Sequence, residues 1–353
     1  MTPVAHKLSL RLWMLLIVGM TGITTANAEG GFVKVLRRFD KWLEKSQRAG
    51  IDTAYQDIPK LNRQVYVGSY TYWQNYQMTM PFDVDNLTSI IPGIRNNDRY
   101  QINAYAVQSE VDLGIDWKGL ALELPIPIRN RYRLSLGLAK NGSKWGLRVR
   151  YKYLHQMDGT CNVGDQTISE NNALRIFFLE GYYVLNSRKF SLAAGLFADM
   201  VQKKSAGSPL FYANYYQSRY RVDKLFPANN DVFKTQQASI GAGYAYNLSV
   251  RGGKLVFHGS IVPMFTAYSH LSHETDIDDE AQNKKWDEFY ESAEKGNARF
   301  CLNLFARFAM NYSFDRYLLT LLLHYRHYGY SDDQHLRILN QEADAQINFG
   351  VRF

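Results

Sequence analysis

Basic side chains recur at every second position along several segments of this chain. Within Lys144 to Met157, for example, Arg148, Arg150 and Lys152 alternate with apolar residues. Side chains two residues apart on a strand lie on the same face, so these cations would gather charge on one surface. The cations placed in this way are Arg131, Arg133, Arg148, Arg150, Lys152, Arg299, Arg307 and Arg352.

Two kinds of chemistry fit such a basic surface. It could line a constriction that attracts anions. It could instead form an internal salt-bridge network, which we favour because like charges on neighbouring strands repel each other unless they are paired or hydrated. The carboxylates available to that network are Glu110, Asp112, Asp116, Asp199 and Asp344.

A histidine and a serine also stand two residues apart, at His270 and Ser272. A histidine within hydrogen-bond reach of a serine hydroxyl can activate it as a nucleophile for acyl hydrolysis. The segment that follows, Glu274 to Lys295, is acidic and contains a D-x-D-D-E cluster whose carboxylates could bind Ca²⁺. It lacks the glycine and the spacing of a defined calcium loop, so the sequence predicts a solvated loop, no metal site and no cofactor.

The elements that must position these residues are best seen at the C-terminus. From Ala343 to Phe353, apolar and polar residues alternate strictly, and the chain ends on an aromatic residue. This period predicts a strand with one apolar face. A terminal amphipathic strand ending in Phe353 resembles the closing strand of bacterial outer-membrane β-barrels, in which this end also serves as an assembly signal.

Similar alternation upstream predicts about twelve strands in a transmembrane antiparallel β-barrel. Short connections alternate with long ones, as periplasmic turns and external loops do in such barrels. In this scheme Asn186 to Arg188 is a short turn, Lys189 to Val201 is a strand, and Gln202 to Phe233 is a long loop. A soluble β-sandwich or lipocalin-like barrel is the competing architecture, but it gives no reason for the loop asymmetry.

In a membrane barrel, a His–Ser pair at the end of a lipid-facing strand resembles the site of outer-membrane acyl hydrolases. The parity of Leu255, Phe257 and Ile261 places odd-numbered positions outward. His270 and Ser272 are therefore predicted to point inward unless a β-bulge intervenes.

The N-terminus predicts export. A basic start, an apolar stretch from Leu12 to Met20 and an A-N-A sequence before Glu29 form the pattern of a signal peptide. We expect residues 1–28 to be the signal peptide, 29–62 a periplasmic segment and 63–353 the barrel. Gly31 to Arg48 has helical spacing of apolar residues and a basic polar face, so it could lie on the inner leaflet or pack under the barrel mouth.

Composition agrees with a barrel. The chain of 353 residues carries a formal net charge of +8, and removing Lys7 and Arg11 with the signal leaves 8 − 2 = +6. This charge is modest for the length, and no nucleic-acid motif is present. The 25 tyrosines, 19 phenylalanines and 6 tryptophans suit aromatic belts at the two membrane interfaces.

Several segments resemble a family known as domain of unknown function 4421, from bacteroidete-type bacteria. They include W-L-E-K-S at Trp42, Y-Y-V-L-N-S-R-K-F-S at Tyr182, Q-K-K-S-A-G-S at Gln202 and G-A-G-Y-A-Y at Gly241. The resemblance implies an outer-membrane barrel and supplies no catalytic residue.

These observations together predict an outer-membrane barrel with a structural role or a role in small-solute passage. The alternative is a lipid acyl hydrolase that uses His270 and Ser272. The expected partners are outer-membrane lipid and the barrel-assembly machinery, which would read Phe353. Nucleic acid is not expected as a partner, and the oligomeric state stays open.

Overall fold

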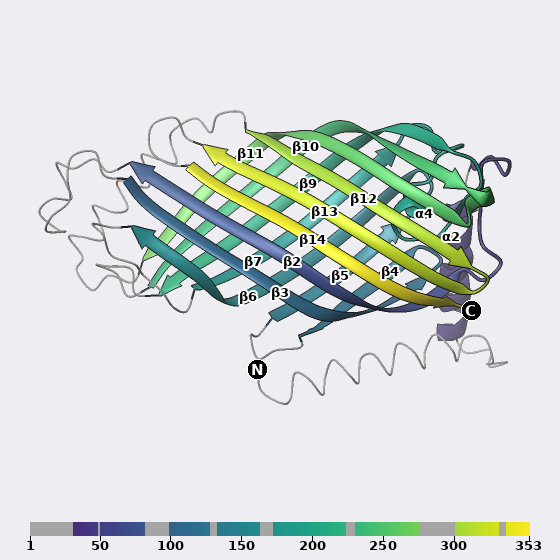
Figure 1. The fold of residues 1–353 in the computed structure, drawn as a ribbon, viewed down its shortest axis with the longest axis horizontal. Helices are drawn as coiled ribbons and strands as arrows, with labels where there is room; N and C mark the ends of the chain where they lie inside the picture. The colour runs from purple at the N-terminus through teal and green to yellow at the C-terminus, as the bar shows by residue number, and fades with distance from the viewer. Residues whose placement is uncertain are drawn as a thin grey trace, which may run out of the picture.

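The chain forms a closed barrel of twelve antiparallel strands in a computed structural model (Figure 1). The structure describes residues 31–48, 50–81, 99–127, 133–162, 172–223, 230–275, 301–331 and 337–353. The barrel strands are β2 (Arg63–Pro81), β3 (Arg99–Trp117), β4 (Leu120–Pro127), β5 (Arg133–Asn141), β6 (Trp145–Asn162), β7 (Asn172–Val184), β9 (Ala206–Asp223), β10 (Asn230–Val250), β11 (Leu255–Thr275), β12 (Leu302–Phe314), β13 (Tyr317–Ser331) and β14 (Arg337–Arg352).

Consecutive strands are neighbours around the wall, and the last strand closes on the first. β14 pairs with β2, with Phe349 opposite Val67, so that no sheet edge is left open. The prediction of an all-β antiparallel barrel of about twelve strands with a short amphipathic N-terminal helix is therefore confirmed.

The two ends of the barrel differ in their connections. One end, here called the short-turn end, carries tight turns such as Lys118–Gly119, where both residues have positive φ (52° and 79°). This backbone matches the twist of a two-residue hairpin. The C-terminus lies at the same end (Figure 1). At the opposite end, here called the loop end, the strands are joined through segments outside the described residues.

Side chains alternate between the wall's two faces. On β10, Leu248, Tyr246, Tyr244 and Ile240 point outward and are exposed, whereas Ala245 and Asn247 are buried. Exposed large apolar residues occur at the same parity around the barrel, as at Val67, Val107, Leu138, Leu147, Phe211, Ile261, Phe308, Leu319 and Ile347. The outer surface is thus largely apolar, and the buried polar side chains of the strands face the interior.

β4 and β5 form a short hairpin within the wall. β3 pairs with β4 from Glu110 to Trp117, and nearer the loop end it pairs directly with β6, from Gln101 to Tyr105. The wall therefore contains two fewer strands at the loop end than at the short-turn end.

The prediction was wrong between Lys189 and Asp223. Residues 206–223, predicted as loop, are strand β9, which pairs with both β7 and β10. The predicted strand Lys189 to Val201 is instead folded inward as a plug, which we define as residues 185–205. The plug contains helix α4 (Leu192–Leu196) and strand β8 (Val201–Gln202), and β8 pairs with β1 (Gln56–Asp57).

Helix α4 of the plug is apolar on all sides because it is surrounded by protein. All five residues of α4 are buried, which neither face of a membrane strand would require. The Ser191 side chain accepts a hydrogen bond from the Ala194 amide at 3.0 Å and so caps the helix.

Helix α2 (Gly31–Arg48) crosses the barrel at the short-turn end (Figure 1). Its Asp40 carboxylate accepts hydrogen bonds from Trp117 Nε1 and Lys118 Nζ, both at 2.8 Å, and Leu43 is buried. Val35, Phe39 and Trp42 remain exposed. The helix therefore packs under the barrel mouth and also keeps an apolar face free. No helix in the described part of the chain is long and apolar enough to cross a membrane.

Candidate functional site: the filled lumen

The plug is held to the barrel wall by side chains from several strands. Gln64 Nε2 on β2 donates to Asp199 Oδ1 at 2.9 Å, and Asn141 Nδ2 on β5 donates to Asp199 Oδ2 at 3.0 Å. Arg352 Nη2 on β14 donates to the Ala198 carbonyl at 2.6 Å. β14 and β2 are neighbours and β5 lies three strands further along the wall, so these contacts fasten the plug to one side of the barrel.

Helix α4 approaches β10 and β11 so closely that only glycine fits at its contact. A Cβ atom on Gly195 would lie 2.5 Å from His258 Nδ1, well inside van der Waals contact. His258 Nδ1 is also 2.7 Å from Asn247 Oδ1, and Asn247 Nδ2 donates to the Ser191 carbonyl at 2.7 Å. The plug and the wall therefore share one continuous hydrogen-bonded network.

A layer of buried ion pairs also fills the lumen. Arg307 on β12 contacts Glu180 on β7 at 2.6 Å, and Arg148 lies 3.9 Å from the same carboxylate. Each of these side chains is at most 5% exposed. Burial of a charge is costly unless it is paired, so this layer is stable only as a connected network.

The network continues to β13 and β14, the strands that follow β12 in the wall. Arg326 Nη1 lies 2.8 Å from Glu342 and 3.0 Å from Asp344, and Lys152 also contacts Glu342. Arg150 lies within 4 Å of both Glu342 and Glu123. Cations from β6, β12 and β13 thus share carboxylates from β4, β7 and β14, which links strands that are not neighbours.

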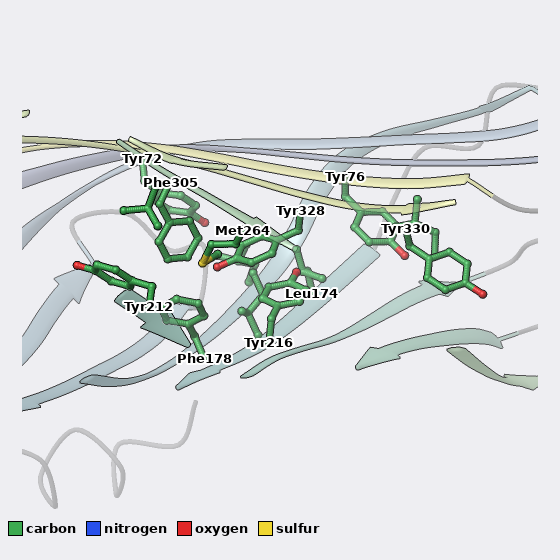
Figure 2. Packing of buried hydrophobic residues seen from close by; sticks show 14 of the residues in the cluster. Tyr72, Tyr76, Leu174, Phe178, Tyr212, Tyr216, Met264, Phe305, Tyr328 and Tyr330 are labelled. Carbon is green, nitrogen blue, oxygen red and sulfur yellow. The ribbon is translucent and has the colours of Figure 1, made fainter. Parts of the chain in front are cut away.

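Aromatic side chains pack beside the ion pairs, since Arg307 lies over the Tyr212 ring and Arg326 over the Phe178 ring. Figure 2 shows these rings in the cluster of buried side chains. Tyr216 stacks on Tyr328 with ring centroids 4.2 Å apart, and Tyr76 stacks on Tyr220 at 4.5 Å. Phe178 and Phe305 lie next to this group, at 5.8 Å from each other. The rings come from opposite sides of the barrel and are almost fully buried. The plug, the ion pairs and the rings together fill the lumen at successive levels.

Five of the cations that the sequence assigned to the lumen have described side chains. Arg148, Arg150, Lys152, Arg307 and Arg352 are all inside and buried. Arg131 and Arg299 lie outside the described residues, and so do the side chain of Arg133 and most of the acidic segment after Glu274. Among the residues described, no cluster of histidine, cysteine and acidic side chains could hold a metal ion.

His270 and Ser272 do not point inward as the outward parity of Leu255 predicted. Along β11 the pairing with β10 shifts, because Ala238 pairs with Tyr268 and Ser239 with Thr266, which leaves Ala267 as a bulge. The bulge reverses the parity beyond it, so Tyr268 is exposed and Leu271 is buried. His270 and Ser272 consequently lie on the outer face, near the loop end.

Several important lumen residues were missed. Arg326, Glu342, Glu180 and His324 carry much of the ion-pair layer. A signal was present, since Arg326 shares its strand face with His324 and Tyr328, and Glu180 shares its face with Phe178 and Tyr182. The sequence analysis assigned the aromatic residues in general to belts at the membrane interfaces, whereas many of them face the lumen in this barrel.

The family model for the domain of unknown function DUF4421 matches residues 65–353, which covers all but the first residues of the barrel. The chain belongs to this family. No curated protein sequence matches it.

Solved structures similar to this DUF4421 chain include three bacterial proteins. They are the beta domain of the Bordetella autotransporter BrkA (10% identity, TM-score 0.36, covering 81% of this chain and 99% of that one), the translocator domain of the autotransporter NalP from Neisseria meningitidis (8%, 0.30, 91% and 96%) and the P. putida toluene transporter TodX (8%, 0.27, 84% and 91%). With TM-scores below 0.5, these structures do not contribute to the fold assignment, which rests on the strand pairing.

Proposed function

We propose that this protein is an outer-membrane β-barrel with a closed lumen and a structural role. The observation that carries the proposal is the pairing of an apolar outer surface with a filled interior. On β10 the outward apolar stretch from Leu248 to Ala238 covers eleven residues, which are ten residue-to-residue steps. At about 3.4 Å per residue and a tilt of about 45°, it is roughly 24 Å tall, close to the apolar band of membrane barrels.

The closed lumen favours the structural role over small-solute passage. Solute passage would require the plug to leave and the ion-pair and aromatic layers to separate. A porin-like protein keeps a polar, water-filled interior, whereas this lumen contains stacked rings. We assign the short-turn end to the periplasmic side, together with α2 and the segment of residues 29–62. A cleaved signal peptide at residues 1–28 and a bacteroidete-type source complete the proposal.

The test is conductance of the full mature barrel refolded into planar bilayers. Insertion is checked separately, by heat-modifiable migration on gels and by protease protection in vesicles. We expect inserted barrels that carry no steady current. Stable open channels in the wild-type protein would overturn the closed lumen, and failure to insert would overturn the membrane assignment.

A second candidate function, lipid acyl hydrolysis, is favoured by the bulge at Ala267. The bulge turns His270 and Ser272 to the outer face, which is the direction that a lipid-facing site needs. A serine-directed covalent probe would label Ser272 if its hydroxyl is activated. Labelling lost in Ser272→Ala and retained in Ser269→Ala supports the enzyme, and absence of labelling in the wild-type protein rejects it.

We also propose that Phe353 belongs to the signal read by the barrel-assembly machinery. The Phe353 amide donates to the Arg63 carbonyl at 2.9 Å, while its ring is 48% exposed at the barrel rim. Deletion of Phe353 should lower the amount of folded barrel in the outer membrane without preventing refolding of the purified chain. Normal surface levels of the deletion variant would contradict this role.

A further inference from the structure

Three cations stand in one row on the outer face of the barrel. Arg175 on β7 lies opposite Arg219 on β9, and Arg219 lies opposite Lys234 on β10. Their neighbours in the same row are Tyr153 on β6 and Ser272 on β11. These cations are therefore adjacent across three consecutive strands, although they are far apart in the sequence.

The row lies just beyond the loop-end edge of the apolar band. Two residues closer to the short-turn end, the outward positions are Phe177, Gln217 and Gln236, and the next outward positions are Leu179, Tyr215 and Ala238. Arg175 is exposed, and the Arg219 side chain is 42% exposed. Outward cations just beyond an apolar and aromatic surface lie where the headgroups of a membrane leaflet begin.

The row has more positive charge than its described partners neutralise. Glu274 lies 3.4 Å from Arg219 and also contacts Lys234, and it serves both cations. Arg175 lies over the Tyr153 ring, with its guanidinium carbon 4.9 Å from the ring centroid. Like charges directly opposite one another destabilise a sheet, so this arrangement is favourable when an anion bridges them.

We propose that Arg175, Arg219 and Lys234 bind the phosphate group of a lipid in the outer leaflet. Two guanidinium groups and an ammonium present the donors that phosphate oxygens accept, and arginine binds phosphate through two parallel hydrogen bonds. Among the residues that the structure describes, three cations against one carboxylate leave an excess of two positive charges, which matches a phosphate monoester of about −1.5 to −2.

The geometry also fits a headgroup that lies along the barrel wall. Opposite residues on neighbouring strands are about 5 Å apart, so the row spans roughly 10 Å and can hold one phosphate between two or three side chains. The Tyr153 ring extends the row on one side, and a lipid chain could run down from it over Phe177 and Tyr215. The inference rests on the proposed membrane orientation, because only that orientation brings lipid to this face.

The probe is diphosphoryl lipid A, added to the refolded full-length mature barrel in detergent and followed by native mass spectrometry. The test variant combines Arg175→Gln, Arg219→Gln and Lys234→Gln. Its matched control combines Arg188→Gln, Lys254→Gln and Arg316→Gln, which removes three exposed cations at the short-turn end. Dephosphorylated lipid A and inorganic phosphate are the two other ligands compared.

We expect the test variant to bind diphosphoryl lipid A at least about tenfold more weakly than the wild-type protein, since it loses charge-assisted hydrogen bonds. The control variant should bind like the wild-type protein, and dephosphorylated lipid A should bind weakly to all three. Equal binding by the test variant, or equal binding of the dephosphorylated lipid, would overturn the proposal. If inorganic phosphate binds as tightly as the lipid, the site recognises free phosphate and the proposed lipid ligand is wrong.

Heat-modifiable migration and vesicle insertion are measured for every variant. A wild-type barrel that inserts but does not distinguish the two lipids defeats only this inference. A barrel that never inserts defeats the proposed function itself.

Discussion

Arg307 and Glu180 meet at 2.6 Å inside the lumen, although 127 residues separate them in the sequence. Their strands, β12 and β7, are not neighbours in the wall, because β9, β10 and β11 lie between them. Arg307 Nη1 also donates to Tyr212 Oη at 2.6 Å. The pair therefore braces the barrel across its interior, in addition to the hydrogen bonds between adjacent strands.

Glu180→Gln should destabilise the refolded barrel more than Arg307→Met. The first change leaves both Arg307 and Arg148 beside a neutral amide, whereas the second leaves Glu180 with Arg148 at 3.9 Å. Leaving a buried charge unpaired costs about 3–5 kcal/mol, and the double variant should lose less than the sum of the two single losses. Urea unfolding measures all three, and strictly additive losses would show that the two residues are not coupled.

Val149→Arg should be more destabilising than Arg150→Val. Val149 faces outward on β6, whereas Arg150 is buried in the lumen. An arginine on the lipid face near the bilayer midplane costs about 2–4 kcal/mol. Arg150→Val leaves Glu342 paired with Arg326 and Lys152. Unfolding in lipid vesicles compares the two, and the reverse order would contradict the assignment of inside and outside faces.

Gly195→Val should dislodge helix α4 from the wall. Its side chain would occupy the position of His258 Nδ1 and of the Asn247 amide. Overpacking of this kind costs about 1–3 kcal/mol, and we expect faster hydrogen exchange in residues 189–204. Gly259→Ala is the control, because a Cβ at that position has no atom within 4 Å. Unchanged exchange in Gly195→Val would mean that the plug can shift without loosening.

Docking of helix α2 should weaken in acid. Burial raises the pKa of Asp40, but hydrogen bonds from Lys118 and Trp117 outweigh it and hold the pKa below the ordinary value of 3.8. A depressed pKa means that the stabilisation is fully present above pH 3.8 and is lost as the pH falls through the lower folded value. Hydrogen exchange of residues 31–48, corrected for intrinsic rates, should therefore rise only in strong acid.

Asp40→Asn tests this prediction at neutral pH. Without the carboxylate, Lys118 keeps Glu44 at 3.2 Å as its acidic partner among the residues described. Exchange in α2 should then be faster at neutral pH and should respond less to acid. Asp315→Asn, in an exposed turn at the same end, is the control and should leave α2 unchanged.

The alternation of apolar and polar residues was sufficient to predict the barrel, its strand number and the lumen position of Arg148, Arg150 and Lys152. It failed where a predicted strand, Lys189 to Val201, belongs to the plug and where part of a predicted loop is strand β9. Residues 206–223 begin with Ala-Gly-Ser-Pro and carry many neutral polar residues, so their period was hidden. Leu192 to Leu196 resembled part of a strand because every residue there is small or apolar, which total burial in the plug explains.

The candidate site could be predicted only in part, for two physical reasons. The parity of β11 reverses at Ala267, and a bulge depends on the register of both strands, which one segment alone does not determine. Ion pairs such as Arg307 with Glu180 depend on which strands face each other across the lumen. That arrangement follows from closure of the whole barrel, and no local pattern encodes it.

The short hairpin of β4 and β5 makes the barrel a wedge. Twelve strands surround the short-turn end, but β3 and β6 pair directly near the loop end, so two strands drop out of the wall there. With neighbouring strands about 4.8 Å apart, the circumference differs by roughly 10 Å or more between the two ends. Inserted as proposed, the protein takes up more area in the inner leaflet than in the outer one. Many copies packed together would therefore favour curvature of the membrane sheet.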